Sequence, residues 1–352
     1  MSKAKPRRGG PFADPRFRRL VWSIVGILGW LGLIALGLSL FAQRPPRAGF
    51  DLTLILDAGR RVADGQSPYL AGSVTTGTQV EDLFYSYPPP VAQVASLVGR
   101  LSNGSALAVF AVLAILGFAA VAVGMARQPV SGDPVRDDAG GRRSGAALDV
   151  LAPALGLGPY VYPFAIALLF GNLDATFPFV YGAVLLAVSS RSVGWRLAGG
   201  VGLGLITVAK LHPGALLGWL AVRGLRDLRS RAGASQTAPS NPSAPWRRPR
   251  PWTTLALAIG AIVVVVVISL GVGGSGPWID YLAMLRAGTG AAFSSSLNIG
   301  PASQLALALG DPASTPRLAP FVSVVALGVT ALAAFAVRST LLSFAIAAAA
   351  SW

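Results

Sequence analysis

The sequence contains no cysteine, which excludes disulfide bonds, thiolate catalysis and cysteine-ligated metal sites. Charged residues are also scarce. They make up 12% of the chain, about half of the fraction that is typical of soluble globular proteins. No Asp-x-Asp pair occurs, and the adjacent pair Asp137 and Asp138 lies in a polar stretch between apolar segments. We therefore expect neither a metal ion nor another cofactor.

Apolar residues take the place of charge and make up 53% of the 352 residues. Residues 20–42 carry no charge, and a run of about 20 apolar residues is what a helix needs to cross a bilayer. This segment is too long for the apolar core of a signal peptide, so we interpret it as a retained transmembrane helix. The sequence predicts an all-α, multi-pass protein of the cell (plasma or inner) membrane, with further spans at 104–126, 147–170, 174–190, 197–222, 253–272, 319–337 and from 339 onward.

Basic residues outnumber acidic ones by 29 to 14, which gives a formal net charge of +15. Most of them gather in a few polar stretches between the apolar spans, and a cytoplasmic location for these stretches satisfies the positive-inside rule. The charge therefore indicates topology, and no nucleic-acid partner is expected. The expected organisation is a basic cytoplasmic tail at 1–19, a single membrane domain at 20–352, and flexible cytoplasmic loops at 128–146 and 228–251.

The apolar stretch 197–222 permits two topologies. A single crossing would place the arginine-rich stretch 223–250 outside and reverse every later span. We favour a hairpin of two half-length helices that turn near Lys210, because non-helical backbone is tolerated at membrane depth where protein or a wet cavity surrounds it. With this hairpin the remaining polar clusters all face outward, at 51–90, 171–174, 210–212 and 278–304.

The first of these outer stretches predicts an amphipathic helix that lies in the membrane interface. Asp51 occupies an N-cap position and Gly65 occupies the position of a C-terminal stop. Apolar residues recur at helical spacing on one face, namely Leu52, Ile55, Leu56, Gly59, Val62 and Ala63. An interfacial helix in the first outer loop is therefore part of the predicted fold.

The charges on the opposite face of this helix have a structural interpretation. Asp57 with Arg61, and Arg60 with Asp64, have the i,i+4 spacing of surface ion pairs. The aromatic and proline residues that follow, in the sequence Tyr-Ser-Tyr-Pro-Pro-Pro at 85–90, are likewise typical of an interfacial aromatic belt and a rigid turn.

Several short motifs occur in a specific order and carry a family resemblance. They follow Asp51 as Gly65-x-x-Pro68-Tyr69, Tyr87-Pro88-Pro89, Gly171-Asn172-Leu173-Asp174, Lys210-Leu211-His212-Pro213 and Leu297-Asn298-Ile299-Gly300. This order resembles the lipid-linked-sugar mannosyltransferases of glycosyltransferase family 87, which have the multi-helix GT-C architecture. Asn172, Asp174 and the pair Ile299-Gly300 depart from the family pattern. The family commonly continues beyond Ser-Trp, so we expect the chain to be truncated at Trp352.

The resemblance implies transfer of mannose from a polyprenyl-phosphate donor to a hydroxyl of a lipid or glycan acceptor, on the extracytoplasmic side and among membrane lipids. Asp51 would be the general base of this reaction. The cations expected near the donor phosphate are Lys210, Arg60, Arg61 and His212. The residues expected to contact substrate are Tyr69, Tyr87, Asn172, Asp174 and Asn298.

Each of these roles has an alternative. Asp51 is also a helix cap, Lys210 a lysine that snorkels from a helix end, and His212 a turn residue beside Pro213. A related enzyme would use the same fold with another lipid-linked sugar, such as arabinofuranose or glucose. A non-enzymatic lipid transporter or scaffold is a further alternative, although no inverted repeat is evident.

Overall fold

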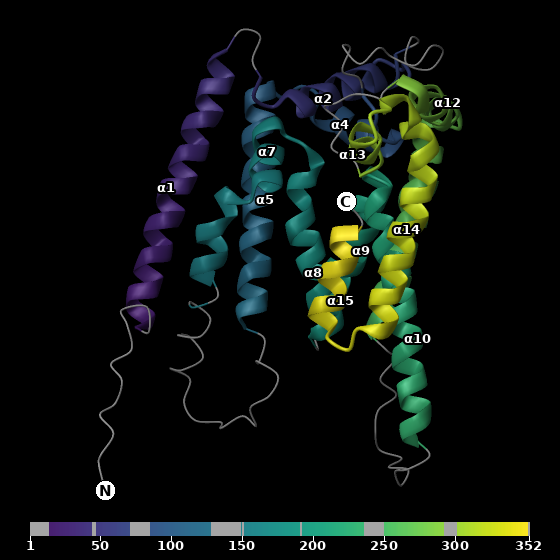
Figure 1. Ribbon diagram of the computed structural model, residues 1–352. Coiled ribbons are helices and arrows are strands. Elements are labelled where there is room, and N and C mark those ends of the chain that lie inside the picture. Colours follow the sequence, from purple (N-terminus) through teal and green to yellow (C-terminus); the bar gives the residue numbers. More distant parts are fainter. Residues whose placement is uncertain are drawn as a thin grey trace, which may run out of the picture. The chain divides into compact units, whose positions relative to one another are not determined.

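Helices form all the regular secondary structure in the computed structural model, which describes residues 14–43, 47–70, 85–127, 149, 151–190, 192–235, 250–291 and 301–350 (Figure 1). No strand occurs among these residues, so the predicted all-α class is confirmed. Within the same ranges, four helices are long and apolar enough to cross a membrane. They are α1 (Pro15–Ala42), α5 (Asn103–Ala126), α11 (Arg250–Gly273) and most of α14 (Thr315–Ala336).

A fifth crossing exists if a bent helix pair counts as one span. The helix Leu151–Tyr160 and α7 (Tyr162–Phe170) meet at an angle of 65°. Between them Val161 is extended, with φ −76° and ψ 94°. Pro163 explains the break, because proline has no N–H to donate and its ring excludes the carbonyl four residues earlier. The span predicted over 147–170 therefore corresponds to a bent helix pair and not to one straight helix.

The chain divides into two compact units, which we describe separately. Unit 1 comprises residues 1–50 and 107–182, and unit 2 comprises residues 51–106 and 183–352. The single membrane domain predicted over 20–352 stays a prediction, because compactness alone does not define an independently folding domain.

In unit 1, α1 packs closely on the helix Leu151–Tyr160. A Cβ atom added to Gly156 would lie 2.7 Å from the carbonyl oxygen of Trp22, which is closer than real Cβ atoms approach. Only glycine permits this contact. The indole Nε1 of Trp30 also donates a hydrogen bond of 3.1 Å to the carbonyl oxygen of Leu155. Backbone proximity and a side-chain bond thus hold the two helices together.

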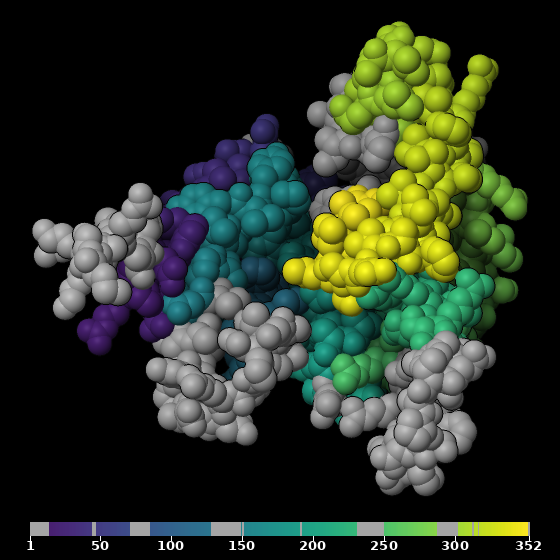
Figure 2. Space-filling view, turned by 60° about the horizontal axis from the view of Figure 1, so that its bottom comes forward, coloured from purple at the N-terminus to yellow at the C-terminus, as the bar shows by residue number. Residues whose placement is uncertain are grey.

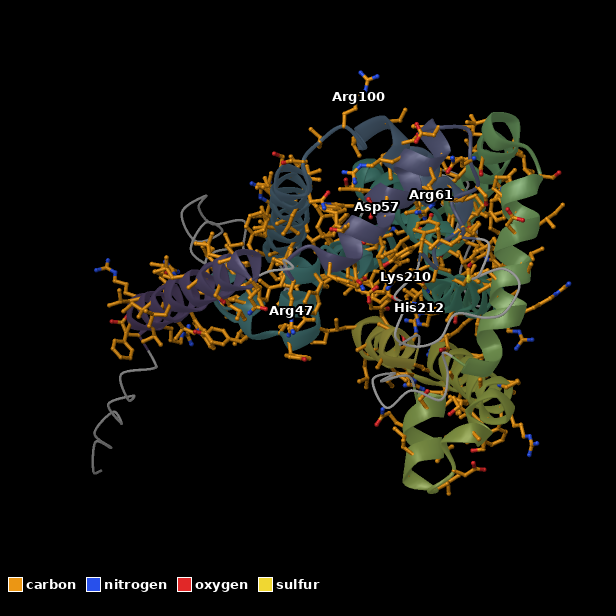
Figure 3. All side chains as sticks on the ribbon, turned by 90° about the horizontal axis from the view of Figure 1, so that it is seen from above. Arg47, Asp57, Arg61, Arg100, Lys210 and His212 are labelled. Atoms are coloured by element: carbon orange, nitrogen blue, oxygen red, sulfur yellow. The ribbon has the colours of Figure 1, made fainter. Side chains whose placement is uncertain are left out.

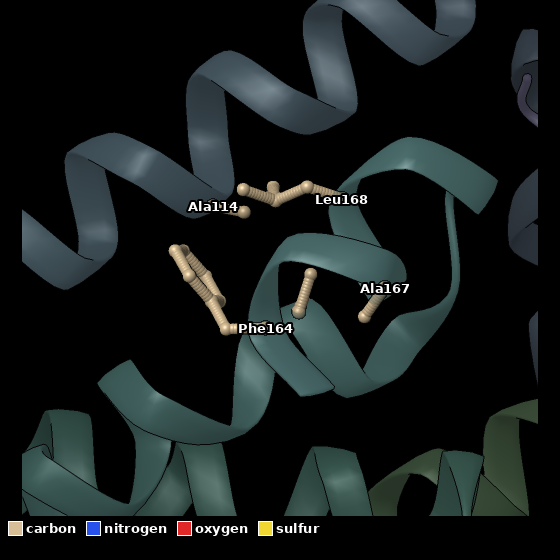
Figure 4. Packing of buried hydrophobic residues seen from close by; sticks show 5 residues of the cluster. Ala114, Phe164, Ala167 and Leu168 are labelled. Carbon is tan, nitrogen blue, oxygen red and sulfur yellow. The ribbon is translucent and has the colours of Figure 1, made fainter. Parts of the chain in front are cut away.

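The core of unit 1 lies between α5 and α7 (Figure 4). Ala114 of α5 meets Phe164, Ala167 and Leu168 of α7, and all four side chains are buried. The ring of Phe118 packs 5.3 Å from that of Phe164, measured between centroids. Ala114 on α5 leaves room for the larger side chains of Phe164 and Leu168 on α7, as close packing requires.

Unit 2 contains two helices that run in parallel, α9 (Val193–Ala209) and α11. A Cβ atom on Gly200 would meet Leu257 at 2.6 Å, and one on Gly204 would meet the carbonyl oxygen of Ala258 at 2.4 Å. The residue numbers in contact increase in the same direction along both helices, as they do when two helices are parallel. Both helices therefore begin at the same end of unit 2.

The chain between α9 and α11 returns through α10 (Ala215–Ser235), so the predicted reversal near Lys210 is confirmed. Lys210 is extended, with φ −143° and ψ 125°, and the short 3-10 helix η4 (His212–Gly214) follows it. Farther along, Gly224 of α10 packs against the indole of Trp252, near the start of α11.

The expectation of half-length helices in this hairpin is wrong, since α9 has 17 residues and α10 has 21. Ser192 starts α9 early by accepting a hydrogen bond of 3.3 Å from the backbone N–H of Trp195. At the other end α10 continues to Ser235 and includes residues 228–235, which the sequence assigns to a flexible loop.

Two arginines of α10 hold the turn between α14 and α15 (Thr340–Ala350). Arg223 donates to the carbonyl oxygens of Val337 and Arg338 at 2.9 and 3.0 Å, and Arg226 donates to Val337 at 2.6 Å. In Figure 2 the yellow surface of α14 and α15 lies against the green surface of α10. The side chains of Arg223 and Arg226 therefore satisfy carbonyl groups at the C-terminal end of α14. Their positive charges also count toward the positive-inside pattern.

The other end of unit 2 gathers four shorter helices (Figure 1). They are α2 (Phe50–Ala63), α4 (Pro89–Val98), α12 (Gly276–Ala291) and α13 (Pro301–Ala308). The amide of Gln93 on α4 donates a hydrogen bond of 3.0 Å to the carbonyl oxygen of Ser269, near the C-terminal end of α11. This end of unit 2 also contains Lys210.

Candidate functional site

The interfacial helix predicted from the first outer stretch corresponds to α2. Leu52, Ile55, Leu56 and Gly59 are buried as predicted. A Cβ atom on Gly59 would lie 2.6 Å from the backbone of Ala95, so α2 crosses α4 where only glycine fits. The burial of three other residues of this helix differs from the prediction: Ala58 is also buried, Val62 is half-buried and Ala63 is exposed. The last turn of α2 therefore lies beyond its contact with α4.

Asp51 lies in the first turn of α2 instead of at the N-cap, because the helix already begins at Phe50. Gly49 precedes it with φ 72°, a left-handed conformation. The cap interpretation of Asp51 is therefore wrong, although a carboxylate in a first turn still interacts favourably with the helix dipole. The side chain is half-buried. Its role as a general base stays a prediction.

The ion pair on α2 differs from the two that the spacing predicts. Arg60 pairs with Asp57 at 2.6 Å, three residues earlier, and not with Asp64. Arg60 also donates to the carbonyl oxygen of Gly99 at 3.1 Å and to the side chain of Asn103 at 3.2 Å. Three hydrogen bonds thus connect this guanidinium to its own helix and to the chain after α4. This arrangement favours a structural role for Arg60.

Arg61 holds the chain that follows α2. Its Nε and Nη2 atoms donate to the carbonyl oxygen of Pro68 at 3.2 and 2.6 Å. Gly65, with φ 73°, ends the helix as predicted, and the N–H of Gln66 returns to the carbonyl oxygen of Arg61 at 2.8 Å. Burial lowers the pKa of Arg61. The side chain therefore sits in a partly desolvated position between α2 and the Pro68-Tyr69 segment.

Five aromatic residues pack together beside α4, and we call them the aromatic cluster: Tyr69, Tyr85, Tyr87, Trp278 and Tyr281. Tyr69 lies 5.6 Å from Tyr85 and 6.0 Å from Tyr281, and Tyr85 lies 5.8 Å from Tyr87, between ring centroids. Trp278 meets Tyr281 edge to face at 6.3 Å. Tyr69, Tyr85 and Tyr87 are at most 8% exposed. The interpretation of Tyr85 and Tyr87 as a belt at the membrane surface is therefore wrong.

Hydrogen bonds fix the tyrosines of this cluster. The Tyr69 hydroxyl donates to the carbonyl oxygen of Tyr87 at 2.8 Å. The Tyr85 hydroxyl donates to the carbonyl oxygen of Pro88 at 2.7 Å and accepts from the N–H of Ala92 at 2.9 Å. Pro89 and Pro90 have no N–H, so fewer N–H groups at the start of α4 need an acceptor. The Tyr85 hydroxyl satisfies the N–H of Ala92. The Tyr-Ser-Tyr-Pro-Pro-Pro motif thus forms a helix start closed by its own tyrosine.

Burial keeps three hydroxyl groups of this cluster in the neutral form. Burial raises the pKa of Tyr69, of Tyr85 and of Tyr281 above the ordinary value of a phenol. Neighbouring tyrosines raise the first two further. The hydroxyl groups of Tyr69 and Tyr85 therefore keep their protons and can donate the hydrogen bonds described above.

Lys210 meets the aromatic cluster from the break after α9. Its Nζ atom lies over the ring of Tyr87, 5.5 Å from the centroid, within the range of a cation–π interaction. The structure thus brings together a predicted phosphate ligand and a predicted substrate-contacting residue. His212 begins η4 and is exposed. Figure 3 looks onto this end of unit 2 and labels Lys210, His212, Asp57 and Arg61.

Four residues that were not among those predicted also lie beside this site: Ser67, Ser269, Trp278 and Asp280. Ser67 donates a hydrogen bond of 2.7 Å to the carboxylate of Asp280, and the indole of Trp278 donates one of 3.1 Å to the hydroxyl of Ser269. The polar stretch at 278–304 could have indicated Trp278 and Asp280 in the sequence. Nothing in the local sequence predicts that Asp280 pairs with Ser67.

The remaining predicted residues are not part of unit 2 or lie outside the described residues. Asn172 and Asp174 belong to unit 1, where the Asn172 side chain accepts a hydrogen bond of 3.0 Å from the Asp174 N–H and caps the short helix η3 (Leu173–Thr176). This hydrogen bond is local to the chain between α7 and η3 and indicates a structural role for the Asn172 side chain. Asn298 lies outside the described residues.

Comparison with known proteins adds no relative. No family model matches the chain, no curated protein matches it, and no solved structure matches it. Membership of glycosyltransferase family 87 therefore stays a prediction, which rests on the order of the sequence motifs.

Proposed function

We propose that this protein is a membrane-embedded glycosyltransferase, which moves a mannosyl residue from a polyprenyl-phosphate donor to a hydroxyl of a lipid or glycan. The observation that carries the proposal is the position of the Lys210 ammonium group, at the helix break after α9 and over the Tyr87 ring. An ionisable residue is costly within an apolar segment and is by default a functional hypothesis. The motif order supplies the reaction class.

In the proposed reaction the acceptor hydroxyl oxygen bonds to the anomeric carbon of the sugar while the bond from that carbon to the phosphate oxygen breaks. The bonding electrons leave with polyprenyl phosphate, which gains negative charge. Lys210 stabilises this charge, and the hydroxyl proton passes to the carboxylate of Asp51. Both residues belong to unit 2.

The contacts described above indicate which of the other predicted cations have a structural role and which could contact phosphate. Arg60 and Arg61 hydrogen-bond to protein carbonyl oxygens next to α2, so we assign them to holding this helix and the Pro68-Tyr69 segment. His212 is exposed two residues after Lys210 and is the second candidate for a phosphate contact. Lys210 therefore carries the main prediction.

Charge supports an extracytoplasmic location for this end of unit 2. α10 and α11 place Arg223, Arg226 and Arg250 toward the opposite end, since α10 runs away from Lys210 and α11 begins there. Segments rich in arginine favour the cytoplasm. The α2–α4 end would then face outward, where polyprenyl-phosphate sugars would meet their acceptors.

A transfer assay with membranes that contain the protein tests the proposal. We expect labelled mannose to move from polyprenyl-phosphate-mannose to membrane lipid or glycan, and Asp51→Asn and Lys210→Gln to lower the rate by about a hundredfold or more. Arg100→Gln is the matched control, because Arg100 is exposed and its substitution removes one positive charge, as Lys210→Gln does. Parallel donors that carry glucose or arabinofuranose identify the sugar.

Protein abundance is measured in the same membranes. Equal rates for the parent and Lys210→Gln would remove this lysine from the reaction. An absence of transfer from all three donors by an abundant parent protein would overturn the enzyme assignment itself.

A further inference from the structure

Unit 1 has a cavity of about 240 Å³ that none of the preceding roles uses. It lies at the start of α1, against the residues that precede and open the helix Leu151–Tyr160. Its lining consists of Arg18, Arg19, Trp22, Asp149, Ala152 and Pro153. One water takes up about 30 Å³ in the liquid, so the space admits a group much larger than a single water.

The charges of the lining do not cancel. Asp149 is the one carboxylate among the lining residues, and it pairs with Arg19 at 2.8 Å between Oδ1 and Nε. This hydrogen bond, together with the charges of Arg19 and Arg18, lowers the pKa of Asp149, so the pair stays ionised. Arg18 therefore leaves the cavity with one net positive charge.

The apolar part of the lining indicates the depth of the cavity in a membrane. Trp22, Ala152 and Pro153 line it beside the two arginines. From Leu20 onward α1 is apolar and uncharged. Tryptophan and arginine at the end of such a helix are typical of the level of lipid headgroups. The cavity is thus polar on one side and apolar on the other, like the region where a phospholipid headgroup joins its acyl chains.

We propose that this cavity binds the phosphate group of an anionic membrane phospholipid. Guanidinium groups present planar, paired donors that match phosphate oxygens. Basic pockets between transmembrane helices are a known means of holding anionic headgroups. Arg18 supplies the charge that the lipid phosphate neutralises, while Arg19 is kept in place by Asp149, and the acyl chains extend along the apolar surface of α1.

Native mass spectrometry of the full-length protein, released from bilayers that contain phosphatidylglycerol and phosphatidylcholine, tests this proposal. We expect the parent protein to retain one phosphatidylglycerol in preference to phosphatidylcholine. Arg18→Gln should lower the retained fraction about fivefold, the attraction expected of one arginine near an anionic leaflet. Arg18→Lys keeps the charge and should retain more lipid than Arg18→Gln.

Arg16→Gln is the matched control, because Arg16 lies in the same first turn of α1 but does not line the cavity. It should change the retained fraction by less than about twofold, because Arg16 makes no contact with the cavity, whereas attraction to the membrane surface alone would act on both arginines alike. Equal losses in Arg16→Gln and Arg18→Gln, with unchanged thermal midpoints, would overturn the proposal. Displacement of the lipid by millimolar inorganic phosphate alone would assign the cavity to free phosphate and would also overturn it.

Discussion

The ammonium group of Lys210 lies 5.5 Å from the centre of the Tyr87 ring. The two residues come from distant parts of the sequence, one from the break after α9 and one from the start of α4. Tyr87 is in turn held by the Tyr69 hydroxyl, which donates to its carbonyl oxygen at 2.8 Å. The position of the cation therefore depends on the packing of the aromatic cluster, and this dependence can be tested.

Tyr87→Leu should destabilise unit 2 and release Lys210, whereas Tyr87→Phe should keep the ring under the cation. A partly desolvated cation–π interaction contributes about 0.5–2 kcal/mol, and the leucine variant also loses buried aromatic area. We expect a lower thermal midpoint in detergent for Tyr87→Leu than for Tyr87→Phe. Tyr162→Leu is the control, because Tyr162 is 71% exposed. Identical midpoints for the two Tyr87 variants would show that the ring does not matter.

Gly59→Ala should destabilise the protein, because the new Cβ atom would lie 2.6 Å from the backbone of Ala95. Overpacking of this kind costs about 1–3 kcal/mol when backbone has to move. Gly218→Ala in α10 is the opposite case. Nothing lies within 4 Å of its added Cβ, so the better helix propensity of alanine should stabilise by up to about 1 kcal/mol. Thermal or denaturant unfolding in detergent measures both, and a neutral Gly59→Ala would contradict the close crossing of α2 and α4.

Stability should fall as pH rises above about 10, where phenols of an unfolded chain ionise. Burial raises the pKa of Tyr69 and of Tyr85, so the folded chain keeps protons that the unfolded chain loses. A raised pKa contributes stability that is complete below the unfolded value and is lost as pH increases beyond it. Each such tyrosine changes the free energy of unfolding by up to about 1.4 kcal/mol per pH unit.

The thermal midpoint measured between pH 9 and pH 11 checks this dependence. Tyr69→Phe should flatten the decline because it removes one of the titrating groups, whatever it does to the midpoint at neutral pH. A slope that is equal in the parent and in Tyr69→Phe would contradict the burial of this hydroxyl.

Local patterns predicted part of the fold well. The buried face of α2, its end at Gly65 and the reversal near Lys210 each follow from a few neighbouring residues: helical spacing, a glycine stop and a charge within an apolar run. The break at Val161 had a local cause too, in Pro163, and continuous hydropathy over 147–170 concealed it.

The parts that sequence patterns did not predict depend on contacts between distant segments. The i,i+4 rule offers Arg60 a partner on its own helix, but Gly99 and Asn103 reach it only after α4 has folded against α2. The same holds for Ser67 with Asp280 and for Arg223 with the turn after α14. Such pairs follow from tertiary packing, which overrides local spacing.

The absence of cysteine makes the proposed orientation directly testable with single introduced cysteines. Arg100→Cys lies after α4, at the end of unit 2 that contains Lys210, and Ser230→Cys lies near the end of α10, on the arginine-rich side. Both positions are exposed.

In intact cells a membrane-impermeant maleimide should label Arg100→Cys and leave Ser230→Cys unlabelled until the membrane is permeabilised. The physical reason is that the arginines around α10 and α11 favour retention in the cytoplasm. Labelling of Ser230→Cys in intact cells would place the arginine-rich end outside and remove the extracytoplasmic location of Lys210, while labelling of both positions would contradict a membrane between the two ends of unit 2.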